Sequence, residues 1–130
     1  MDLLCYSTLK EKVCLRFYPC KDVRDGKNWW DDWHKHEPLT VYISDYEKLM
    51  LVEYFNKVYP IIDDGEEETA FDVCTWNWIA AEYWQKIIVF IKNDIKTVSN
   101  EQEKQFYFSF VDWIENQLEW ADTIVVDGNQ

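Results

Sequence analysis

The sequence predicts a single α+β domain, mainly α, in which about three helices at residues 45–59, 76–96 and 100–121 accompany a few short strands, chiefly N-terminal. Apolar residues recur with helical spacing in the three segments, whereas they alternate with other residues near the N-terminus. A length of 130 residues suffices for one hydrophobic core and is too short for two. The apolar fraction of 48% and the aromatic fraction of 18% exclude disorder of the whole chain.

The pattern in the N-terminal third is compatible with more than one conformation. Alternate apolar residues from Val13 to Phe17 favour one or two short strands within residues 1–20, although the leucines before them also fit one face of a helix. Residues 21–28 are charged and contain Gly26, which is typical of a loop. No backbone conformation is favoured for residues 29–38. Alternation at residues 39–43 predicts a further strand.

The first predicted helix covers residues 45–59. Ser44 and Glu47 have the spacing of a capping box, in which each side chain satisfies a backbone N–H of the first turn, and Pro60 ends the segment. The following run, residues 63–68, contains only one uncharged residue, Gly65. Mutual repulsion predicts that this acidic run lies at the surface.

The second predicted helix, residues 76–96, is expected to form the centre of the fold, with Thr75 as its N-cap. A helical wheel places one broad set of residues in the core: Trp76, Tyr83, Trp84, Ile87 and Ile91. The opposite, polar half of the wheel carries Trp78 and Val89. We therefore interpret Trp78 as an exposed aromatic residue that is available to a partner.

The third predicted helix, residues 100–121, has Ser99 and Gln102 in a second capping-box pattern. A broad apolar arc would face the core, while four acids at i, i+3, i+7 and i+10 predict a continuous acidic ridge: Asp112, Glu115, Glu119 and Asp122. Phe108 projects from the same side as the ridge. Residues 123–127, TIVVD, are expected to form a short edge strand.

Several kinds of chemistry find little support in the sequence. The three glycines lie far apart, so a glycine-rich phosphate-binding loop is not expected. His34 and His36, with the carboxylates of Asp31, Asp32 and Glu37, offer suitable metal ligands, but they follow no standard ligand spacing and fit a solvated loop better. The acidic run at 63–68 does not match a calcium-binding loop. We expect neither an enzyme nor a bound cofactor.

The cysteines and the hydropathy pattern indicate a cytoplasmic protein. The four cysteines show no C-x-x-C pair, which favours free thiols in a reducing compartment. No segment approaches the roughly 20 apolar residues of a membrane span, and the N-terminus lacks the pattern of a signal peptide. We therefore expect no membrane partner.

The charge favours a basic partner. The net charge is −12, and residues 1–43 are balanced, so that the whole excess of acid lies in residues 44–130. Direct binding to nucleic acid would have to overcome repulsion by phosphates, whereas a cationic protein would be attracted. The alternative is that the acidity serves only solubility.

Acidic segments interleaved with large aromatic residues form the pattern most suggestive of function. Tryptophans and tyrosines are enriched at interface hot spots, and carboxylates attract and pair with basic side chains. Trp29, Trp30 and Trp33 fit either the core or the surface, whereas Trp76, Trp84, Trp113 and Trp120 are assigned to the core. The candidate partner-binding residues are Trp29, Trp30, Asp31, Asp32, Trp33, Asp63, Asp64, Glu66, Glu67, Glu68, Trp78, Phe108, Asp112, Glu115, Glu119 and Asp122.

The segment FDVCTWNWIAAEYWQKII, residues 71–88, resembles a segment of small bacterial immunity proteins from polymorphic-toxin and contact-dependent inhibition systems, and residues 110–130 are similar in style. The resemblance implies a cytoplasmic protein that binds one cognate toxin, often a nuclease, and blocks its active site or substrate path. Two alternatives remain open. One is a phage-encoded acidic inhibitor of a host nucleic-acid-binding complex, and the other is a small metal-dependent enzyme that uses His34 and His36.

Overall fold

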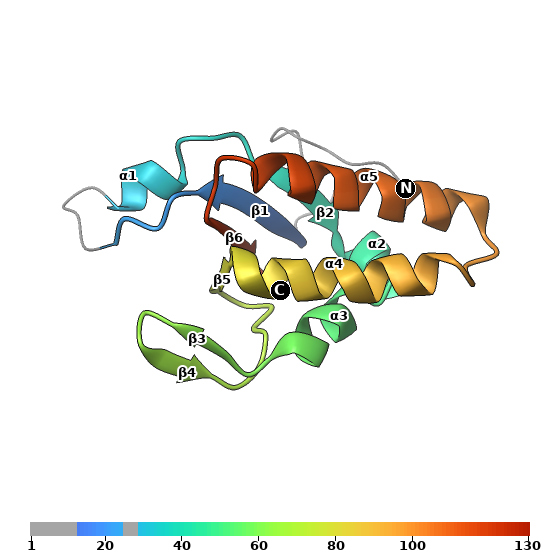
Figure 1. Ribbon diagram of the computed structural model, residues 1–130, viewed down its shortest axis with the longest axis horizontal. Helices are drawn as coiled ribbons and strands as arrows, with labels where there is room; N and C mark the ends of the chain where they lie inside the picture. Colours follow the sequence, from blue (N-terminus) through green and yellow to red (C-terminus); the bar gives the residue numbers. More distant parts are fainter. Residues whose placement is uncertain (1–12, 25–28) are drawn as a thin grey trace.

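A computed structural model of the chain describes residues 13–24 and 29–130. The described residues form five helices and six strands, with 45% helix and 25% strand, arranged as a four-stranded antiparallel sheet, a separate two-stranded hairpin and a helical layer (Figure 1). The sheet has the order β2-β1-β6-β5 and consists of β1 (Cys14–Cys20), β2 (Leu39–Tyr42), β5 (Trp76–Ala80) and β6 (Thr123–Gly128). The hairpin consists of β3 (Ile61–Asp63) and β4 (Glu66–Glu68), and the helices are α1 (Trp29–Trp33), α2 (Ile43–Lys48), α3 (Leu51–Val58), α4 (Ala81–Ile95) and α5 (Glu101–Gln117).

The prediction of a mainly helical fold with chiefly N-terminal strands is wrong, because strands occur throughout the chain. The predicted edge strand at residues 123–127 is instead the inner strand β6, which pairs with β1 on one side and with β5 on the other. Both pairings are long-range, and local sequence patterns carry little information about such partners. The sheet therefore combines strands that lie far apart in the sequence.

The largest local error concerns residues 76–80, which form strand β5 and not the start of the central helix. Helix α4 begins at Ala81, and its N-cap is Ala80, so Thr75 is not the cap. The strand continues directly into the helix. Because the strand has only five residues, its apolar side chains also fit the apolar side of a helical wheel drawn for the following helix. In a strand, successive side chains point to opposite faces. Trp76 and Trp78 therefore share one face of the sheet, and Asn77 and Ile79 share the other.

The other two predicted helices also change their limits. The segment 45–59 is divided into α2 and α3 by Met50, whose φ of 58° is incompatible with a continuous helix. Helix α2 already begins at Ile43, which places Ser44 inside its first turn rather than at its cap. Helix α5 begins one residue later than the capping pattern suggests, because the side chain of Asn100 accepts a hydrogen bond from the backbone N–H of Glu103.

The main hydrophobic core lies between one face of the sheet and residues of helices α3, α4 and α5, of which α4 and α5 are the two long helices beside the sheet in Figure 1. Phe17 of β1 contacts the rings of Phe55, Trp84 and Phe110 at centroid distances of 6.3, 6.1 and 5.4 Å. Trp84 is fully buried, and its Nε1 donates a hydrogen bond to the carbonyl oxygen of Ile124 at 3.2 Å. The helical layer is thus tied to the centre of the sheet.

A second, smaller cluster covers the opposite face of the sheet. It contains Tyr18, Cys20, Trp78 and Val125 from the strands and Trp33 from α1, with Trp29 packed against it. The alternation of side chains in β1, β5 and β6 therefore supplies two buried layers. None of the helices within residues 13–24 and 29–130 is both long and apolar enough to cross a membrane.

Candidate functional site

A pocket of about 510 Å³ lies where strand β5, the β3–β4 hairpin and α1 approach one another. The hairpin and α1 are found at the same end of the molecule, beyond the ends of α4 and α5 (Figure 1). The residues that line the pocket are Arg24, Trp29, Tyr59, Ile61, Asp63, Glu68, Thr69, Ala70, Asp72, Thr75, Trp76, Asn77 and Trp78. The lining thus combines indole rings with carboxylates.

Tryptophans form the aromatic side of this pocket. The ring of Trp29 lies 6.2 Å from that of Trp76 and 5.9 Å from that of Trp78, and Trp33 and Trp30 extend the cluster on the side of α1. The strand conformation of β5 places Trp76 and Trp78 on the same face, and the single helical segment α1 brings three further tryptophans against them. These five indoles, at residues 29, 30, 33, 76 and 78, are called the tryptophan cluster below.

The exposure of the cluster differs from the prediction. Trp78 was expected at the surface but is only 6% exposed, whereas Trp76 was expected in the core and is 42% exposed. The exchange follows from the strand conformation of residues 76–80. Trp33 is buried at 1% exposure, and Trp30 remains 46% exposed. The cluster is therefore anchored by two buried rings and presents two exposed ones.

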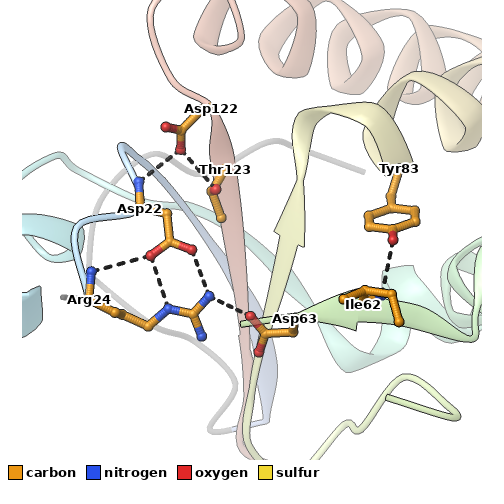
Figure 2. Close-up of polar contacts among 7 residues, drawn as sticks. All are labelled: Asp22, Arg24, Ile62, Asp63, Tyr83, Asp122 and Thr123. Atoms are coloured by element: carbon orange, nitrogen blue, oxygen red, sulfur yellow. Dashed lines mark hydrogen bonds and ion pairs between the residues drawn. The ribbon is translucent and has the colours of Figure 1, made fainter. Parts of the chain in front are cut away.

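Arg24 lies against the aromatic wall of the pocket. Its guanidinium carbon is 4.0 Å from the ring centroid of Trp78, which is a cation–π contact. Figure 2 shows the same guanidinium between two carboxylates: Nη2 donates to Asp22 at 2.6 Å and to Asp63 of β3. This bridge fastens the loop after β1 to the hairpin.

The two carboxylates shift the acid–base equilibria of this bridge. Burial alone would lower the pKa of Arg24, but the hydrogen bonds to Asp22 and Asp63 outweigh it, and the pKa is raised above its ordinary value. The hydrogen bond from Arg24 in turn lowers the pKa of Asp22. Both groups are therefore charged at neutral pH, and the bridge is a charge-assisted interaction.

The pocket has an excess of negative charge. Arg24 is the one basic residue among the described residues that line it, and it is opposed by Asp63, Glu68 and Asp72. Within residues 13–24 and 29–130, no ion pair joins Glu68 or Asp72 to a basic side chain. Burial raises the pKa of Tyr59, and the negative charges of Glu68 and Asp63 raise it further. The charge of the pocket lining thus favours binding of a cation over binding of an anion.

Asn77 holds the segment that forms one wall of the pocket. Its side-chain amide donates to the carbonyl oxygens of Asp72, Thr75 and Val126, and its Oδ1 accepts from the backbone N–H of Asp72 at 2.8 Å. A buried amide with four partners fixes the course of the chain between the hairpin and β5. No local sequence pattern distinguishes this residue.

The pocket brings together only some of the candidate residues that the sequence predicted. Trp29, Asp63, Glu68 and Trp78 line it. The other acids of the hairpin, Asp64, Glu66 and Glu67, are exposed beside the pocket. On α1, Asp31 is exposed and Asp32 is partly buried.

The predicted acidic ridge does not form. Helix α5 ends at Gln117, so Glu119 and Asp122 lie beyond it. Glu115 pairs with Lys92 at 3.2 Å, and Asp122 accepts hydrogen bonds from the backbone N–H of Asp22 and the hydroxyl of Thr123 (Figure 2). Phe108 is 51% exposed and Asp112 is exposed, but neither lines the pocket.

The histidines do not assemble a metal site. No group of three or more His, Cys, Asp or Glu side chains suitable for a metal ion occurs in the described part of the chain. The ring of His34 packs against Trp33, and its Nδ1 lies 2.9 Å from the carbonyl oxygen of Trp30. His36 packs instead on Trp120. Both rings therefore have structural contacts.

Residues of the pocket that sequence reasoning missed or misassigned include Arg24, Tyr59, Asp72, Thr75, Trp76 and Asn77. One overlooked signal is the Asp64–Gly65 pair, whose φ angles of 50° and 80° form the hairpin turn that such pairs favour. Another is the alternation of Trp76 and Trp78 with Asn77 and Ile79. The position of Arg24 depends on contacts with residues that are distant in the sequence, so no local sequence pattern indicates it.

Comparisons with protein-family models, with curated proteins and with solved structures found no match to this chain.

Proposed function

We propose that this chain is a non-enzymatic cytoplasmic binding protein that neutralises a cationic protein toxin, in the manner of bacterial immunity proteins. The observation that carries the proposal is the pocket, in which the exposed indole of Trp76 stands beside two carboxylates, Glu68 and Asp72, that form no ion pair with a basic side chain among the described residues. Aromatic anchors surrounded by complementary charge are the usual composition of an interface hot spot. The surface is suited to capture basic side chains.

The toxin class that best fits this surface is a nuclease. An enzyme that holds nucleic acid presents a cationic cleft, because it must bind phosphates. The net charge of −12 attracts such a cleft at long range, and the indoles of Trp30 and Trp76 provide apolar contact area after docking. The segment that resembles immunity proteins, residues 71–88, also contains two tryptophans of the pocket.

The direct test is neutralisation of the toxin domain encoded immediately upstream of the gene for this chain. We expect the two purified proteins to form a stable complex, the nuclease activity to be inhibited, and co-expression to restore growth of cells that produce the toxin. The absence of a complex together with the absence of growth rescue would contradict the proposal.

Salt dependence separates the two components of the proposed interface. The Debye length falls from about 10 Å at 0.1 M salt to about 3 Å at 1 M, so association should slow as salt is added. Stopped-flow measurement of the association rate of the complex tests this expectation. A rate that is independent of salt would contradict electrostatic attraction and leave the aromatic contacts as the source of affinity.

A further inference from the structure

The pocket already contains one guanidinium group, which shows the chemistry that it accommodates. Arg24 stacks on Trp78 at 4.0 Å and is held by the carboxylates of Asp22 and Asp63. An indole face together with carboxylates matches the planar, delocalised cation of arginine better than the compact ammonium of lysine. Figure 2 shows how the two carboxylates flank this group.

The rest of the pocket repeats the same components without such a partner. Trp76 is 42% exposed and Trp29 is partly buried, so indole surface remains accessible beside Arg24. Glu68 and Asp72 add two carboxylates, for which no ion pair with a basic side chain occurs in the part of the chain that the structure describes. The components of a second guanidinium site are therefore present.

Size and charge narrow the choice of occupant. A volume of about 510 Å³ lies within the range of roughly 300–1,000 Å³ that is typical of ligand pockets, and it leaves room for a long side chain. An anion would be repelled by Asp63, Glu68 and Asp72, and a neutral group would leave their charge uncompensated. A further cation reduces this excess charge.

We infer that the pocket is an arginine receptor, in which a guanidinium group from the partner protein stacks on Trp76 and pairs with Glu68 and Asp72. The inference rests on the proposed function and assigns to the toxin an exposed arginine that enters the pocket. The bound arginine lies beside Arg24, whose own charge is compensated by Asp22 and Asp63. Trp29, whose ring meets that of Trp76 edge to face at 6.2 Å, borders the same site.

Short peptides test this site without the toxin. The probe is acetyl-Gly-Arg-Gly-amide, and its counterparts contain citrulline, which has nearly the same shape without the charge, or lysine. We expect the arginine peptide to shift the indole N–H NMR signals of Trp29 and Trp76 and to bind about tenfold more tightly than the citrulline peptide. Equal affinity for arginine and citrulline, or no shift with either peptide at millimolar concentration, would overturn the inference.

Paired variants show whether the response comes from the pocket. Glu68→Gln and Trp76→Ala should weaken binding of the arginine peptide by about threefold or more. Glu101→Gln removes the same charge from an exposed residue outside the pocket, and Phe90→Ala removes an exposed ring elsewhere, so both should bind as the wild type does. Equal losses in a variant and its matched control would contradict a site at this pocket.

The same variants separate this inference from the proposed function. If the toxin is neutralised equally by the wild type, Glu68→Gln and Trp76→Ala, the arginine site is wrong although the protein still acts on the toxin. If the arginine peptide binds as expected and the toxin is not neutralised, the receptor stands and the proposed function is wrong.

Discussion

The two faces of the four-stranded sheet differ in how completely they are covered. On the helical face, the 15 residues of α4 and the 17 residues of α5 bury Phe17 and Trp84 completely. On the opposite face, the described cover consists of the five-residue helix α1 and the side chain of Arg24, and the tryptophan cluster remains partly exposed. Because the same strands supply both layers, the contrast comes from the covering elements. We therefore expect the helical face to contribute most of the stability, and our proposal places recognition on the aromatic face.

The largest test of this division compares one tryptophan from each face. Trp84→Ala should lower the free energy of unfolding by about 3–5 kcal/mol, because it removes a fully buried ring and its hydrogen bond to Ile124. Trp76→Ala should cost only about 1 kcal/mol, because the ring is half exposed. Urea denaturation followed by circular dichroism measures both changes.

A milder pair keeps this comparison measurable if Trp84→Ala does not fold. Trp84→Phe retains much of the buried ring and should cost about 1–3 kcal/mol, whereas Trp76→Phe should be close to neutral. Similar losses at both positions would contradict the division between a stabilising face and a recognising face.

The second test concerns the residue that links the two faces. Asn77 points from β5 away from the tryptophans, yet it fixes the chain segment that lines the pocket. Asn77→Ala should destabilise the fold by about 2–3 kcal/mol, because it leaves buried backbone groups without partners. Faster hydrogen exchange at the backbone N–H groups of residues 72–75 should accompany the loss. Unchanged exchange in that segment would show that Asn77 does not support the pocket wall.

The helical face was the more predictable part of the fold. Trp84, Ile87 and Ile91 are buried, which confirms their assignment to the core from the wheel of the central helix. The sequence pattern failed at residues 76–80 because a five-residue strand that leads directly into a helix leaves too short an alternation to be distinguished from a turn of helix. The strand order could not be predicted, since β1 and β6 pair across most of the length of the chain.

The aromatic face could be predicted only as a list of residue types. Tryptophans and acids indicated a recognition surface, and four of the candidates, Trp29, Asp63, Glu68 and Trp78, line one pocket. Their exposure was not predictable, because it depends on where α1 lies relative to β5. The predicted ridge on the last helix failed for a related reason: the helical pattern of acids continues past Gln117, whereas the helix itself ends there.

A smaller effect is expected at the turn of the hairpin that borders the aromatic face. Gly65 has a φ of +80° and no atom within 4 Å of the position of a Cβ, so Gly65→Ala adds backbone strain without a steric clash. We expect a loss of about 1 kcal/mol or somewhat more. The backbone NMR shifts of β3 and β4 should change while those of α5 do not. Equal changes in α5 would contradict the independence of the hairpin from the helical face.

The smallest effect concerns the pH dependence of the ion bridge on the aromatic face. The hydrogen bond from Arg24 lowers the pKa of Asp22 in the folded protein, so the bridge contributes stability above the ordinary carboxylate pKa of about 4. This contribution is lost as the pH falls through the lower folded pKa, because protonated Asp22 no longer pairs with Arg24. Asp22→Asn should therefore destabilise the protein at pH 7 by less than about 1 kcal/mol, since the pair is partly exposed to solvent.

The difference between Asp22→Asn and the wild type should shrink as the pH falls below the ordinary carboxylate pKa, and it should vanish once the pH has passed the lowered pKa of Asp22 in the folded protein. Asp112→Asn, which removes an exposed carboxylate from α5 without breaking an ion pair among the described residues, serves as the control for net charge. Urea unfolding between pH 7 and pH 2.5 measures the three proteins. If the two variants depend on pH in the same way, the Arg24–Asp22 pair adds nothing to stability, and the loop after β1 is then held by the ion pair of Arg24 with Asp63 of the hairpin and by its packing on Trp78 of β5.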